Sequence, residues 1–344
     1  MPFIDYVLEP PTYGWQNEKG ELIKPNPKEI WAEFFRRVNI FHSKKNWLPF
    51  AGWFWVLCLL PFVYFFFAEY FTWPRFVLGL AYSLICMGTH GTIWYHRYST
   101  HHAYKFTNNF WRFVTQHLVI KVMPEETYVV SHHVHHSKSD MPGDPYNASA
   151  GFLYCFLADT NHQPISRNLN EEDYKRVSEL LKHTGMSRNS YEQYQKWASV
   201  SHPFKTIFEI LMNWVFWATV FYFIGGPALV CTLFGCAFFW ALGIRTFNYQ
   251  GHGKGKDKRK HGVDFNTSDM SINEWRPGFL AGEWHNNHHL YPSSARAGFL
   301  PHQVDFAWYY IYFLYLIGGV SSYHDAKKSF KEKYYKPFKE KTLS

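Results

Sequence analysis

Four blocks of almost uninterrupted apolar sequence constrain this chain most, because each is long enough to cross a lipid bilayer. They occupy roughly residues 47–71, 73–95, 206–224 and 227–247, and a membrane-spanning helix needs about 20 apolar residues. Only one or two residues separate the members of each pair, so each pair predicts a helical hairpin. The mean hydropathy of −0.30 is typical of a soluble protein, but the average conceals this segregation.

Positive charge gathers on the side of the membrane opposite the hairpin turns. The net charge is +8, and lysine and arginine are concentrated in residues 254–260 and in the tail after residue 326. Because these stretches flank apolar segments, we interpret them through the positive-inside rule and attraction to anionic lipid, and not as a nucleic-acid-binding surface. We therefore expect an all-α, multi-pass integral membrane protein with four transmembrane helices and both termini in the cytoplasm.

The sequence between and around the spans predicts three regions. Residues 1–45 form a cytoplasmic N-terminal arm, residues 46–325 the membrane domain, and residues 326–344 a basic cytoplasmic tail. Residues 108–124 predict an amphipathic interfacial helix, and residues 160–200 a soluble excursion whose helix begins after Asn170 and stops at Gly185. We expect residues 304–320 to lie in the interface, since a fifth span would move the tail to the opposite side.

Three histidine clusters lie where the chain leaves the membrane on the predicted cytoplasmic side. Neutral imidazole is the commonest biological metal ligand, and nine candidates are too many for one ion, so we expect two ions with four or five nitrogens each. The candidate ligands are His96, His101, His132, His135, His136, His252, His285, His288 and His289, with Asn248 a candidate to hold a water on one metal.

The spacing of these histidines predicts how they face one another. In the two HxxHH clusters the imidazoles at i, i+3 and i+4 share one helical face, and we expect them to converge on a shared point. His252 shares a face with Asn248 by the same rule. His96 and His101 are turned about 140° apart on a regular helix, so we expect them to straddle a helix end or to serve different metals.

An all-histidine site beside a membrane favours an apolar substrate that enters from lipid. Removal of hydrogen from an unactivated methylene is beyond acid–base catalysis, so a redox metal with oxygen is the expected agent. The spacing alone does not distinguish iron from zinc.

The three clusters, in this order, resemble the histidine boxes of the membrane fatty acid desaturase family. The family pattern HxxxxH, HxxHH, HxxHH matches the clusters that begin at His96, His132 and His285, and the string AGEWHNNHHLYPSSARAGF is similar to the third box of bacterial and plant members. The resemblance covers about residues 45–325. It implies four transmembrane helices beneath a cytoplasmic helical cap that holds two iron ions beside a bent acyl tunnel.

The activity implied by the resemblance is oxygen-dependent insertion of a cis double bond into a saturated acyl chain, carried as acyl-lipid or acyl-CoA. His133 stands where the second box usually has arginine, and Val130-Ser131 replaces an Arg-Asp pair typical of animal acyl-CoA enzymes, which favours the bacterial and plant branch. No His-Pro-Gly-Gly motif of a fused cytochrome occurs. We therefore expect a separate electron donor, a ferredoxin or b-type cytochrome, docking on residues 254–260 or on the tail.

Two supporting roles are predicted outside the boxes. Asp140 and Asp144 are expected either to orient ligand imidazoles or to form a solvated turn at Pro145. Residues of the second span are expected either to line or close the acyl tunnel or to face lipid. These residues are Leu80, Ser83, Leu84 and Gly88.

Three other functions fit parts of the pattern. A hydroxylase or ketolase of the same superfamily uses similar boxes and differs only in its product. A membrane zinc hydrolase would work without oxygen or a reductant. A non-enzymatic receptor or metal-binding scaffold would leave lipid composition unaltered when its metal is removed.

Overall fold

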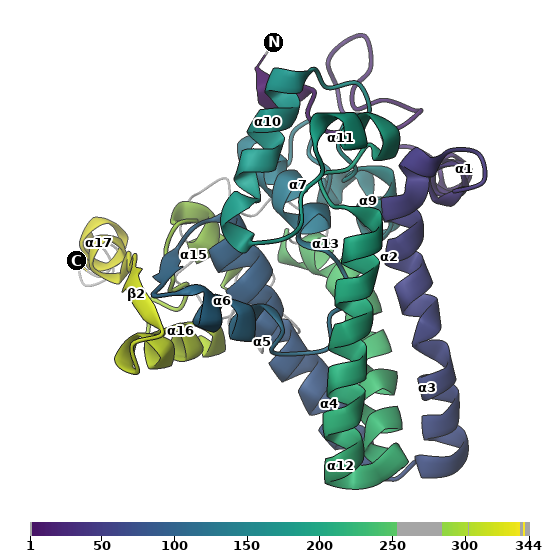
Figure 1. Ribbon diagram of the computed structural model, residues 1–344. Coiled ribbons are helices and arrows are strands. Elements are labelled where there is room, and N and C mark those ends of the chain that lie inside the picture. Colours follow the sequence, from purple (N-terminus) through teal and green to yellow (C-terminus); the bar gives the residue numbers. More distant parts are fainter. Residues whose placement is uncertain (1, 253–283, 302, 338–339, 341–344) are drawn as a thin grey trace.

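The computed structural model is mostly helical and describes residues 2–252, 284–301, 303–337 and 340 (Figure 1). Three of its helical stretches are long and apolar enough to cross a membrane, namely Lys44–Tyr70, Trp73–Thr100 and Pro203–Gly251. The third contains a break at Gly225 and Gly226, where Gly226 has a φ of +66°. The chain reverses at this break, because Trp214 before it packs on Phe234 after it with ring centroids 5.5 Å apart.

The first two stretches are assembled from shorter helical pieces. Thr72 begins the second stretch by accepting a hydrogen bond from the backbone N–H of Arg75. In order, the pieces are α2 (Trp47–Cys58), α3 (Leu60–Phe65), η3 (Phe66–Tyr70), α4 (Trp73–Ala81), η4 (Tyr82–Met87), α5 (Gly88–His90) and η5 (Gly91–Thr100). The last piece is a π-helical segment of ten residues, a geometry that is uncommon and frequently found at functional sites.

The long helices pack closely on α12 (Pro203–Gly243). A Cβ atom at Gly79 would lie 2.3 Å from the Sγ of Cys236, so glycine is required for this close approach of α4 to α12. Buried Leu59 and Trp55 from the first stretch join Trp214 in the same apolar core. The elements after α12 are η8 (Ile244–Thr246) and α13 (Phe247–Gly251).

A cap of shorter helices covers one end of the long helices (Figure 1). Asn26 forms a capping box with Glu29 at the start of α1, and Asn170 caps α10, as predicted. Gly185 ends the following turn in the left-handed conformation, φ 75°. The cap comprises η1 (Phe3–Asp5), α1 (Pro27–Val38), η2 (Lys44–Asn46), α7 (Glu125–Lys138), η6 (Ala148–Ala150), α8 (Phe152–Phe156), α9 (Ala158–Asn161), α10 (Glu171–Leu180), η7 (Lys182–Thr184), α11 (Tyr191–Trp197) and α15 (His285–Leu290).

One flank of the cap carries the only strand pair in the described part of the chain, and the fold is otherwise mostly helical, as expected. Strand β1 (Tyr104–Phe106) pairs antiparallel with β2 (Val320–Tyr323). The neighbouring α16 (Phe306–Leu316) has 11 residues, about 16 Å of helix, which is too short for a membrane core of about 30 Å. This length agrees with an interfacial position. Beyond it lie α17 (Lys327–Phe330) and η10 (Lys331–Tyr335).

The interfacial helix expected over residues 108–124 is wrong in its second half, since α6 spans only Asn109–Gln116. The following backbone bonds to side chains of α12 instead of to itself. Asn213 accepts from the N–H of Lys121 at 2.8 Å and donates to the carbonyl of Val119 at 3.0 Å. Trp214 donates to the carbonyl of Lys121 at 2.8 Å. These bonds satisfy the backbone in an irregular segment, so the apolar residues there are buried without a helix.

Candidate metal centre

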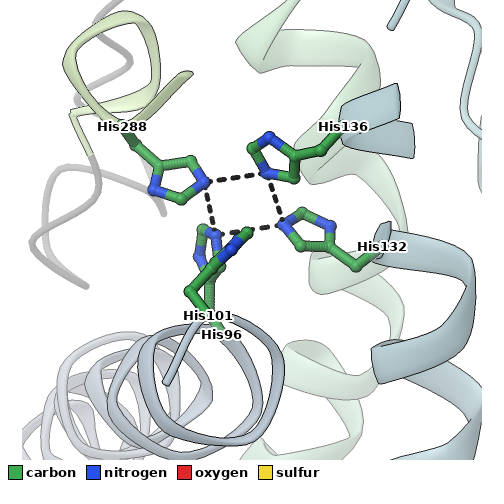
Figure 2. Close-up of side chains that lie close together, drawn as sticks. All are labelled: His96, His101, His132, His136 and His288. Carbon is green, nitrogen blue, oxygen red and sulfur yellow. Dashed lines mark hydrogen bonds between the residues drawn. The ribbon is translucent and has the colours of Figure 1, made fainter. Parts of the chain in front are cut away.

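Five histidines form a first group at the junction of the second long helix and the cap (Figure 2). Their candidate ligand atoms all lie within 4.8 Å of one another. The Nε2 atom of His96 is 2.8 Å from that of His288 and 3.0 Å from that of His132. His136 completes a ring, with its Nε2 atom 3.1 Å from His132 and 3.0 Å from His288. His101 is the fifth member of this group.

A second group contains four histidines, and its candidate ligand atoms also lie within 4.8 Å of one another. The Nε2 atom of His285 is 2.8 Å from that of His252 and 3.1 Å from that of His289. The ring of His135 lies against both neighbours, with centroids 4.8 Å from His252 and 5.3 Å from His289. The nine candidate histidines are therefore divided five and four between two groups.

The division corrects the expectation that each HxxHH cluster converges on one point. His132 and His136 join the first group, whereas His135 between them joins the second. The third cluster divides the opposite way, because only its i+3 member, His288, joins the first group. Residues at i and i+4 are about 40° apart on a helix, but i+3 and i+4 are about 100° apart. Each cluster therefore bridges both groups.

His96 and His101 lie at a helix end, as one of the two expectations had it. His96 is within η5, and His101 directly follows its last residue, Thr100. Both belong to the first group, so the alternative, that they serve different groups, is wrong.

Two carboxylates contact the outer nitrogens of the second group. Asp144, which is fully buried, accepts a 2.9 Å hydrogen bond at Oδ1 from Nδ1 of His135. Asp140 lies 3.0 Å through Oδ1 from Nδ1 of His252. A ring whose Nδ1–H donates to a carboxylate keeps its Nε2 lone pair for the interior of the group.

Asp144 is itself fixed by the backbone around it. It also accepts from the N–H of Asp140 at 2.8 Å and of Tyr146 at 2.9 Å. This buried arrangement differs from the solvated turn that was the alternative for this segment.

Burial holds the clustered imidazoles in their neutral form. Desolvation first, and then charge on neighbouring imidazoles such as His135, lowers the pKa of His136 to about 2. The same two causes hold the pKa of His101, His132 and His288 well below the ordinary 6.5. Neutral imidazole offers the lone pair that a metal requires.

The nitrogen ring of the first group is poorly suited to hydrogen bonding alone. A ring nitrogen that carries hydrogen can only donate, and a bare one can only accept, so four Nε2 atoms with two neighbours each cannot all be well satisfied. The Nε2 atom of His101 is buried and has no hydrogen-bond partner among the described residues. A cation bound by one lone pair from each ring removes both problems. The donor set therefore fits a metal that accepts imidazole, iron included.

An apolar cavity reaches the first group. It is lined by His96 together with residues of α2, of the second long helix, of α7 and of the C-terminal half of α12, including Val56, Tyr95 and Trp240. Leu84 and Gly88 line it, whereas Leu80 and Ser83 are not among the described lining residues. Asn248 also lines it.

Another buried histidine of the second long helix lies outside the two groups. His90 points to the carbonyl of Thr115, with Nε2 2.9 Å from that oxygen, and belongs to neither group. The lysine-rich segment 254–260, expected to dock an electron donor, lies outside the described residues.

Two tyrosines beside the histidines were not anticipated. Tyr128 stacks on His132 with ring centroids 4.7 Å apart, and Tyr146 lies 5.2 Å from His135. Both line the cavity. Tyr128 precedes His132 by four residues on α7, so helical spacing could have identified it. Tyr146 follows in an irregular segment, where no spacing rule applies.

Comparisons with known proteins identify the family of this chain. A family model described as fatty acid desaturase matches residues 71–311. The chain is 28% identical over 330 residues to the acyl-CoA C20 Delta5-desaturase of Anemone leveillei, covering 90% of this chain and 91% of that protein. It is 28% identical over 321 residues to the Delta-9 acyl-lipid desaturase 1 of Arabidopsis thaliana, covering 88% of each. Desaturases are oxidoreductases, and this chain belongs to the fatty acid desaturase family.

Proposed function

We propose that this chain is an oxygen-dependent, di-iron fatty acyl desaturase that inserts a cis double bond into a saturated acyl chain. The observation that carries the proposal is the apolar cavity whose wall includes His96, a member of the first histidine group. When bound, a pair of irons together with O2 supplies the oxidising power to remove hydrogen from an unactivated methylene. Overall, one acyl chain, O2, two electrons and two protons give one double bond and two waters.

The chain's own residues supply binding and orientation. The apolar wall holds the acyl chain by excluding water from it, and the aromatic rings of Tyr95 and Trp240 restrict its path. The five histidines of the first group would hold one iron, and the four histidines of the second group would hold the other. Asn248 is proposed to hold a water on one metal, and Asp140 and Asp144 fix the rings of His252 and His135.

The proposed topology has four spans, with the break at Gly225 and Gly226 dividing the third long stretch into two. The cap and both termini are proposed to face the cytoplasm, because the hairpin turns carry few charges and the tail is rich in lysine. The two electrons would come from a separate protein, a ferredoxin or b-type cytochrome.

The product decides between the proposal and its nearest alternative, a hydroxylase or ketolase. The full chain is expressed in a host with few unsaturated lipids, a ferredoxin or cytochrome donor is supplied, and total acyl chains are analysed by gas chromatography–mass spectrometry. We expect a new cis-monoene that disappears with His135→Ala and persists with His42→Ala, an exposed histidine outside both groups. A hydroxy or keto acid would identify a hydroxylase or ketolase instead. The absence of any new product would contradict both functions.

Asp144→Asn is expected to weaken metal binding in the second group. Its carboxylate accepts from His135 and two backbone N–H groups, and an amide would turn a donor towards one of them. Loss of such an outer partner typically costs about 10–100-fold in metal affinity. Elemental mass spectrometry measures the iron that the variant and the unsubstituted chain retain after dialysis against increasing chelator concentrations. Asp5→Asn is the control, because Asp5 pairs with Lys138 on α7, the helix that carries His135. Equal iron retention in the two variants would contradict the role of Asp144.

Leu84→Trp is expected to shift preference towards shorter acyl chains by filling the cavity that Leu84 lines. Each methylene excluded from an apolar pocket costs about 1–3 kcal/mol, or 10–200-fold in kcat/KM. Competition between saturated substrates of different length measures the ratio of kcat/KM for short and long chains. Leu84→Ala should shift this ratio towards longer chains. Leu78→Trp, on an exposed side of α4, is the control. An unchanged ratio in both Leu84 variants would remove this residue from the tunnel.

A further inference from the structure

A second hollow lies on the flank of the cap where β1, α6 and β2 meet, and the charged residues in its lining are cationic. Lys105 and Arg112 line it, along with His102, His183 and His324. No aspartate or glutamate is among the described lining residues. A concave surface with positive charge and no compensating carboxylate concentrates anions.

Arg112 lacks a partner for its charge. In the part of the chain that the structure describes, its guanidinium has no hydrogen bond or ion pair, and its Nε is buried and unsatisfied. The side chain lies directly over Gly185, where a Cβ atom would come within 1.2 Å of Nη1. The glycine thus makes room for a guanidinium beside the hollow. An unsatisfied charged donor is costly to maintain without an acceptor, and a planar guanidinium suits a phosphate.

Two of the histidines that line the hollow contact each other. The ring of His102 lies against that of His183, tilted by 35° with centroids 3.9 Å apart. His183 Nε2 lies 3.2 Å from the carbonyl oxygen of Tyr98, and His102 has a φ of 50°. His102 thus contacts His183, whereas His101, the preceding residue, belongs to the first histidine group.

The helix that carries Arg112 places the hollow at the membrane surface. Phe110 and Phe113 of α6 are 64% and 59% exposed, and they lie on the side of the helix away from Arg112. The nearby α16 also exposes large apolar side chains, including Phe313 and Leu316. Figure 1 shows both helices on the same flank of the cap. An amphipathic helix with this pattern lies at the boundary between acyl chains and head groups, so its cations are level with lipid phosphates.

The hollow is separate from the acyl cavity. The two share no lining residue, and on η5 the cavity is lined by Tyr95 and His96 whereas the hollow is lined by Tyr98.

We propose that this hollow binds the phosphate of an anionic membrane phospholipid, with Arg112 as its main partner and Lys105 as its second. Basic pockets beside membrane helices are suited to such head groups. The lipid would fasten the flank of the cap, including the segment after His101, to the membrane surface. The inference is independent of the proposed reaction, since it concerns no residue of either histidine group.

The test uses the purified full chain in neutral detergent, titrated with dioctanoyl-phosphatidylglycerol, dioctanoyl-phosphatidylcholine or inorganic phosphate. Ligand that binds only the folded protein raises Tm with its concentration. We expect a saturable rise with phosphatidylglycerol alone. In the double variant Arg112→Gln/Lys105→Gln the apparent Kd should be roughly 10–100-fold weaker, as expected for lost charged hydrogen bonds. The control is Arg176→Gln/Lys175→Gln on α10, outside the hollow.

Several outcomes would overturn the proposal. An equal effect of phosphatidylcholine would mean that head-group charge is not recognised, and an equal effect of inorganic phosphate would make this a site for free anions. An unchanged titration in the Arg112 variant would place the lipid elsewhere. If that variant instead raised the KM for a soluble electron donor, the hollow would belong to a protein partner.

Discussion

Replacing His288 by alanine is expected to abolish activity and to lower the iron content from two ions per chain to one or none. The Nε2 atom of His288 contacts two other members of the first group, His96 at 2.8 Å and His136 at 3.0 Å. Its loss removes one lone pair and leaves a gap in the ring of nitrogens. The loss of iron affinity should exceed the roughly 10–100-fold loss that follows removal of a hydrogen-bond partner of a ligand.

Two readouts separate this effect from misfolding. Elemental mass spectrometry of the purified chain measures bound iron independently of turnover, and circular dichroism checks that the helices remain. His42→Ala, which removes an exposed histidine, should leave iron content and activity unchanged. Full iron occupancy in the His288 variant, together with retained activity, would show that the five histidines do not hold a metal.

The parts of this protein that could be predicted from sequence depend on local signals. Apolar blocks of about 20 residues indicate spans whatever the rest of the chain does. The caps at Asn26 and Asn170 belong to the same class, because a side chain bonds to backbone two or three residues away. The histidines could also be identified as candidate metal ligands from the sequence, because few sites other than metal sites bring so many imidazoles together.

The features that were missed depend on partners distant in the chain. The three- and four-residue strands β1 and β2 are more than 200 residues apart, and strands this short carry no recognisable pattern. The helix expected through residue 124 ends at Gln116 because Asn213 and Trp214 bind the backbone that follows. The division of each HxxHH cluster could have been anticipated from the 100° between i+3 and i+4, but only if the other elements supplying each group were known.

A buried ion cluster near the metal centre shows the same limit. Lys121 and Glu125 form an i, i+4 pair at 2.9 Å that is visible in the sequence. The third member, Glu209, comes from α12 and contacts Lys121 at 2.5 Å. Glu125 also accepts from Trp94 at 3.0 Å. Trp94 precedes His96 by two residues, and Glu125 begins the helix that carries His132, so the cluster fixes two ligand-bearing elements relative to each other.

Lys121→Met is expected to destabilise the protein by about 3–5 kcal/mol, the usual cost of removing one partner from a buried ion cluster. Burial alone would lower the pKa of Lys121, but Glu125 and Glu209 outweigh it and raise the pKa above its ordinary value, so the amine is charged and holds both carboxylates. Without it, the buried carboxylate of Glu125 and the partly buried carboxylate of Glu209 have no cation between them. The loss is measured as a lower Tm of the purified chain, followed by tryptophan fluorescence.

The same substitution at an exposed pair provides the control. Lys182 bonds to Glu179 at 3.0 Å, with both side chains about half exposed or more, and such pairs contribute roughly 0–1 kcal/mol. Lys182→Met should therefore change Tm little. Adding Glu125→Gln to Lys121→Met should recover part of the loss, because it removes one of the two uncompensated charges. If Lys121→Met and Lys182→Met lowered Tm equally, the cluster would contribute no more than a surface pair, and the alignment of η5 with α7 would have to come from apolar packing.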